Sequence, residues 1–80
     1  MALRFIGIDP DTASGNCPSV WVDEASGDLL FQGWEITDPA TLDEVAAKSP
    51  IAANEKIVRL PARMRAIIQE ASSDGVADLR

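Results

Sequence analysis

The change of hydrophobic pattern along the chain is the feature that most constrains its fold. Up to residue 36, apolar residues form short runs that alternate with polar ones, as in β-strands. After residue 60, the apolar spacing becomes that of an amphipathic helix. The apolar stripe of this helix comprises Leu60, Met64, Ile67, Ile68 and Ala71. Strands followed by a closing helix predict an α+β fold.

Three strands are predicted in the first half of the chain, over residues 3–8, 19–23 and 29–36. The segment 23–28 between the second and third strands is typical of a hairpin turn that closes with Gly27 in the left-handed region. In the first strand, strict alternation places Arg4, Ile6 and Ile8 on one face.

The second half is predicted to hold a crossover, a fourth strand and the closing helix. Thr41-x-x-Glu44 has capping-box spacing, which predicts one or two helical turns that stop at Ser49-Pro50. A fourth strand is expected over residues 55–60, and Pro61 ends it. We therefore expect a three- to four-stranded, mainly antiparallel sheet, with the C-terminal amphipathic helix on one face and a short helix in the crossover. Residues 1–73 form one small domain, and residues 74–80 a frayed tail.

The composition narrows the classes of function. The 80 residues include one cysteine and no histidine, so neither an internal disulfide nor histidine-based catalysis or metal binding is available. No apolar run reaches the length of a membrane span, and Asp9 comes too early for a signal peptide. We expect a cytoplasmic protein without a cofactor, a metal or a catalytic constellation.

The net charge of −6 is confined to half of the chain. Residues 1–40 carry seven acids and one base, whereas residues 41–80 carry six of each. Within the second half, the segment 56–65 has four bases and no acid. Its arginines are either a solvated, internally compensated face or a docking surface for an acidic partner. The candidate residues of that surface are Arg59, Arg63 and Arg65.

Trp21 and Trp34 are the other candidates for an interaction surface. Alternation places Trp34 and Phe31 on opposite faces of the third strand, and Trp21 on either face depending on the register. We expect at least one aromatic side chain on the sheet face that the helix does not cover, where it could anchor a partner. The alternative is that both tryptophans belong to the core of a fold this small.

The loop over residues 9–18 is long for a small domain, which makes Asp9, Asp11, Asn16 and Cys17 candidate functional residues. Asp9-x-Asp11 begins like a calcium loop, but the fifth and twelfth positions lack the required ligands. Asx-type bonds from the aspartates to loop amides explain them better. Cys17 has no base within ten residues and is expected to be unreactive.

Two local resemblances give alternative functions. Phe5-Ile-Gly-Ile-Asp9 resembles the first strand of ribonuclease H-like nucleases and actin-like kinases, which implies a metal-dependent hydrolase that uses Asp9 and Asp11. The segment 55–68 resembles the strand and helix of ribbon-helix-helix proteins, which implies a dimer that binds DNA. The acidic first half disfavours nucleic acid, and Ile57 and Val58 are expected to lie in the core of the main sheet.

A broader resemblance covers most of residues 4–68. The motifs RFIG-x-DP from Arg4, CP-x-VWVDE from Cys17, GDL, QGW and VRLPARM from Val58 resemble a group of small uncharacterised bacterial proteins. Such proteins are often encoded beside helix-turn-helix regulators, so the resemblance implies an accessory role in regulation and a transcriptional regulator as partner. The sequence therefore favours a non-enzymatic protein-interaction module.

Overall fold

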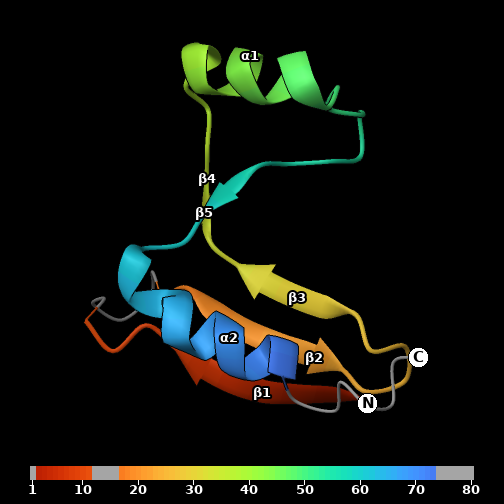
Figure 1. Cartoon of the computed structure of the whole chain (residues 1–80), viewed down its shortest axis with the longest axis vertical. Helices are drawn as coiled ribbons and strands as arrows, with labels where there is room; N and C mark the ends of the chain where they lie inside the picture. Colours follow the sequence, from red (N-terminus) through yellow and green to blue (C-terminus); the bar gives the residue numbers. More distant parts are fainter. Residues whose placement is uncertain (1, 12–16, 74–80) are drawn as a thin grey trace.

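The computed structural model describes residues 2–11 and 17–73 as an α+β fold with two sheets and two α-helices. Three antiparallel strands, β1 (Leu3–Ile8), β2 (Ser19–Asp23) and β3 (Leu29–Gln32), form the main sheet in the order β1-β2-β3. The closing helix α2 (Arg65–Ser73) lies across β1 and β2 (Figure 1). The predicted fold class is confirmed.

The core lies between α2 and one face of the sheet. Val20 and Val22 alternate along β2 and meet Met64 and Ala71, and these four side chains form the buried hydrophobic cluster of the described residues. The rest of the predicted stripe is partly buried against them, together with one residue of β1: Ile6, Leu60, Ile67 and Ile68. The helical spacing read from the sequence therefore identifies the face of the helix that packs on the sheet.

A β-bulge in β1 changes which side chains share a face. Phe5 pairs with Trp21 and Gly7 pairs with Val20, so Ile6 has no partner of its own across the ladder. The extra residue reverses the alternation after Phe5. Ile8 consequently lies on the same face as Phe5, and the prediction that Ile8 shares a face with Arg4 and Ile6 was wrong.

The hairpin between β2 and β3 agrees with its prediction. Gly27 has a φ of 82°, in the left-handed region, and its N–H donates to the Asp23 carbonyl. The Asp23 carboxylate accepts from the amide of Ala25 and fixes the turn.

The third predicted strand, residues 29–36, is broken at Gly33. A Cβ at this position would lie 2.8 Å from the Arg59 carbonyl oxygen, so the close approach of two backbones requires glycine. Beyond it, β4 (Trp34–Glu35) leaves the main sheet and pairs with β5 (Val58–Arg59) in a separate two-stranded sheet. The fourth strand is thus shorter than predicted.

These two short strands carry an arm, residues 34–59, that projects from the sheet and ends in α1 (Pro39–Lys48) (Figure 1). Val58 is 37% exposed, so the expectation that Ile57 and Val58 belong to the core of the main sheet was wrong. None of the residues of α1 is buried. The helix is also longer than the one or two turns expected.

Asp38, and not Thr41, caps the N-terminus of α1. The Asp38 carboxylate accepts from both the hydroxyl and the amide of Thr41, and Pro39 occupies the first helical position. The hydroxyl bond and then the amide bond lower the pKa of Asp38 from its ordinary value. The cap therefore contributes stability above the usual pKa of an aspartate and loses it as the pH falls through the lowered pKa.

The closing helix begins with a short 3-10 turn, η1 (Ala62–Met64), which runs directly into α2. Pro61 comes after β5 and is the N-cap of this turn. Residues 74–80, predicted as a frayed tail, lie outside the described residues.

The packing of α2 on β1 is tested at Gly7. A Cβ at this position would lie 2.8 Å from Ile67 Cγ2, so Gly7→Ala should lower the free energy of unfolding by about 1–3 kcal/mol. In an Ile67→Ala background the methyl group has room, and the same substitution should cost at least about 0.5 kcal/mol less. Urea unfolding of the four proteins measures both costs. Equal costs in the two backgrounds would contradict the packing.

Candidate functional site

Asp9 and Arg63 join the end of β1 to η1, across 54 positions of sequence. Arg63 Nε and Nη2 donate to Asp9 Oδ1 and Oδ2 at 2.6 and 2.7 Å. The Asp9 side chain is fully buried, and its backbone N–H donates to the Pro18 carbonyl at 2.9 Å. This bidentate geometry is the strong form of an arginine–carboxylate pair.

The aspartates of the predicted functional loop surround this arginine. Asp9 Oδ1 also accepts from the amide of Asp11 at 3.0 Å, which is the Asx interaction predicted from the sequence. Asp11 Oδ2 lies 3.7 Å from Arg63 Nε. The hydrogen bonds to Asp9, and then the charges of Asp9 and Asp11, raise the pKa of Arg63. Both carboxylates therefore act on a guanidinium of the same chain.

Asn16 and Cys17 are the other candidates of this loop. Asn16 lies outside the described residues. Cys17 is half-buried directly before the buried Pro18. Among residues 2–11 and 17–73, no three acidic, cysteine or histidine side chains are grouped closely enough to hold a metal ion.

The second candidate site is the sheet face opposite α2, which we call the open face. Its apolar side chains come from all three strands: Leu3, Phe5, Ile8, Trp21 and Leu30. The register fixes their common side, because Phe5 pairs with Trp21 and Trp21 pairs with Leu30. Four of the five, all except Trp21, are 39–49% exposed. Isolated apolar side chains on a surface are ordinary, but a contiguous group on one sheet face indicates an interaction site.

Trp21 is held in place at the centre of the open face. Its indole N–H donates to Ser19 Oγ at 2.9 Å, and the Ser19 hydroxyl donates to Gln32 Oε1 at 2.7 Å. The Phe5 ring meets the indole edge to face, with centroids 5.0 Å apart. The polar groups of Trp21 and Ser19 are thus satisfied within the sheet. A partner that covered this face would leave neither of them unpaired.

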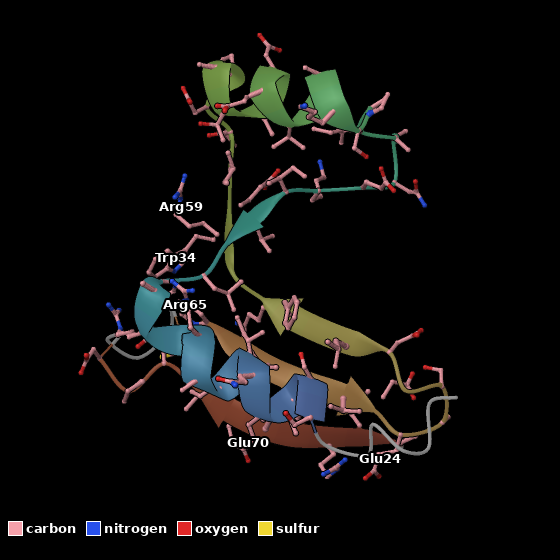
Figure 2. The ribbon with its side chains drawn as sticks, in the orientation of Figure 1. Glu24, Trp34, Arg59, Arg65 and Glu70 are labelled. Carbon is pink, nitrogen blue, oxygen red and sulfur yellow. The ribbon has the colours of Figure 1, made fainter. Side chains whose placement is uncertain are left out.

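The predicted basic surface is only partly assembled. Figure 2 shows Trp34, Arg59 and Arg65 together at the base of the arm, and Trp34 pairs with Arg59 across β4 and β5. Trp34 is 37% exposed, so the alternative in which both tryptophans are core residues was wrong. Within the described part of the chain, Arg59 and Arg65 have no ion-pair partner, whereas Arg63 is turned to Asp9.

The sequence indicated Trp21 as a candidate for an interaction surface but not the other four apolar side chains of the open face. Gly7 is the sequence signal that could have placed Ile8 on this face. An isolated glycine within a strand often marks a bulge or a close backbone approach. The Asp9–Arg63 pair has no local signal, since its members are joined only by the tertiary fold.

Comparison of the chain with protein-family models, with curated proteins and with solved structures found no match. None of the helices in the described residues is long and apolar enough to cross a membrane.

The Asp9–Arg63 pair is tested by substitution of the arginine. Arg63→Ala leaves the buried Asp9 carboxylate without its guanidinium, which should lower the free energy of unfolding by about 1–3 kcal/mol. Arg65→Ala, the same change two residues along the chain, should cost less than about 0.5 kcal/mol. Chemical denaturation followed by circular dichroism gives both values. If the two variants were equally stable, the pair would have no structural role.

Proposed function

We propose that this protein is a non-enzymatic protein-interaction module that docks a partner on the open face of its sheet. The observation that carries the proposal is the group of five apolar side chains on a face that α2 does not cover. Large aromatic and aliphatic side chains that become desolvated at the centre of an interface provide most of its binding energy.

The arrangement of Trp21 supports docking. The hydrogen bonds through Ser19 to Gln32 and the contact with Phe5 hold the indole in one position before a partner arrives. A pre-organised side chain loses less conformational entropy on binding than a mobile one. Sites on strands are also more rigid than sites on loops.

The charged groups support binding in preference to catalysis. Asp9 is occupied by Arg63 and by the Asp11 amide, so its carboxylate stabilises the joint between β1 and η1. A general acid or base needs a group within reach of a substrate proton. The fully buried Asp9 side chain serves a neighbouring arginine instead.

The accessory regulatory role that the bacterial group implies is part of the same proposal, with a transcriptional regulator as the partner. The ribbon-helix-helix alternative has less support, because β5 pairs with β4 of the same chain and Arg63 pairs with Asp9. A strand that enters a DNA groove as part of a dimer pairs with its counterpart in the other subunit.

Leu30 and Leu29 provide a matched test of the open face. They are neighbours in β3, both are 39% exposed, and they point to opposite faces of the sheet. A photo-crosslinking amino acid, p-benzoylphenylalanine, is placed at either position in the native cells. We expect one discrete protein adduct from position 30, and no adduct of that mass from position 29.

A substitution on the open face, Phe5→Thr, tests whether the adduct forms there. Phe5→Thr keeps a strand-forming residue but removes the ring beside Trp21, and it should abolish most of the adduct from position 30. Adducts of equal yield from both leucines, or no adduct from position 30, would refute docking on this face.

A further inference from the structure

The part of the chain that forms the open face carries a net negative charge. Residues 1–33, which contain the main sheet and its turns, carry five acids and one base. That base, Arg4, pairs with Val22 of the core and therefore lies on the side of α2, where Nε binds Glu24 Oε2 at 2.7 Å. None of the three strands β1, β2 and β3 therefore places a basic side chain on the open face.

Acidic groups lie at the hairpin end of the open face. The hairpin end carries Asp23, whose register partner is Leu3, together with Asp28, whose carbonyl accepts from the Asp23 amide. At the other end of the sheet, Asp9 and Asp11 turn to Arg63 of η1, on the side of α2. An apolar surface with acids at its end is complementary to an apolar surface with bases at the matching position.

From this charge pattern, and resting on the proposed function, we infer that the open face binds a cationic amphipathic helix of a partner protein. The surface has the right dimensions. Three strands span about 10 Å, and the six residues of β1 extend about 20 Å. A helix is about 10 Å wide, and about 14 residues of it are 21 Å long. The bound helix would complete a helix–sheet–helix sandwich with α2 on the other side.

A second copy of this chain is a poorer occupant of the same face. Each copy has a net charge of −6. Because residues 1–33 of each copy carry five acids and one base, two stacked open faces bring surfaces of the same negative sign together. Like-charge contacts of this kind oppose association.

A random library of 16-residue peptides displayed on phage tests this inference with the whole protein as bait. We expect the selected peptides to carry net positive charge and apolar residues at i, i+3 or i+4, and i+7. Their binding should fall at least tenfold with Leu30→Thr and change less than twofold with Leu29→Thr. Phe5→Thr is the second open-face variant, and nuclear magnetic resonance spectra establish that each variant folds.

A charge variant separates the cationic requirement from simple hydrophobicity. Asp23→Asn with Asp28→Asn keeps the side-chain oxygens of the turn but removes two charges, so binding of the selected peptides should weaken about threefold to tenfold. Raising the salt concentration should have an effect in the same direction.

The outcomes distinguish the inference from the function on which it rests. Neutral or acidic peptides that still require Leu30 would overturn the cationic helix and leave docking on the open face intact. Peptides that bind equally well to the Leu29→Thr and Leu30→Thr variants, or no selected peptides, would overturn both. A dimer in analytical ultracentrifugation that Leu30→Thr dissociates would make a second copy the occupant and also overturn the inference.

Discussion

The packing of α2 against one face of the three-stranded sheet determines the arrangement of the rest of the molecule. A nine-residue helix is about 13–14 Å long, enough to bury Val20 and Val22 beneath Met64 and Ala71. The other α-helix of the described residues, α1, lies on the arm and away from the sheet (Figure 1). The other sheet face therefore keeps its apolar side chains in contact with solvent, which is the basis for assigning it a partner.

Two features at the boundaries of the sheet keep this arrangement in place. The Asp9–Arg63 pair joins the end of β1 to the start of the closing helix, so the helix enters the sheet at a defined point. Gly33 lets β4 and β5 approach closely and directs the arm out of the sheet. Residues 1–33, which contain the main sheet, carry five acids and one base. This negative charge favours a positively charged partner on the open face.

The sequence predicts the features that depend on local pattern. The hairpin around Gly27 and the stripe of Met64 and Ala71 follow from turn chemistry and helical period. The bulge at Ile6 does not, because one inserted residue reverses a face without changing the composition of the strand. The contact of Asp9 with Arg63 also escapes sequence analysis. Its members are 54 residues apart, and no local propensity reports such a contact.

Solvent accessibility of individual methyl groups tests the central claim, that α2 covers β1 and β2 on one sheet face and leaves the opposite face open. A soluble gadolinium chelate should broaden the methyl resonances of Ile8 and Leu30 strongly, because both side chains are exposed on the open face. The methyl resonances of Val20, beneath the closing helix, and of Met64, in η1, should remain sharp because both side chains are buried. Protection of Ile8 and Leu30 equal to that of Val20, in the isolated protein, would contradict the account.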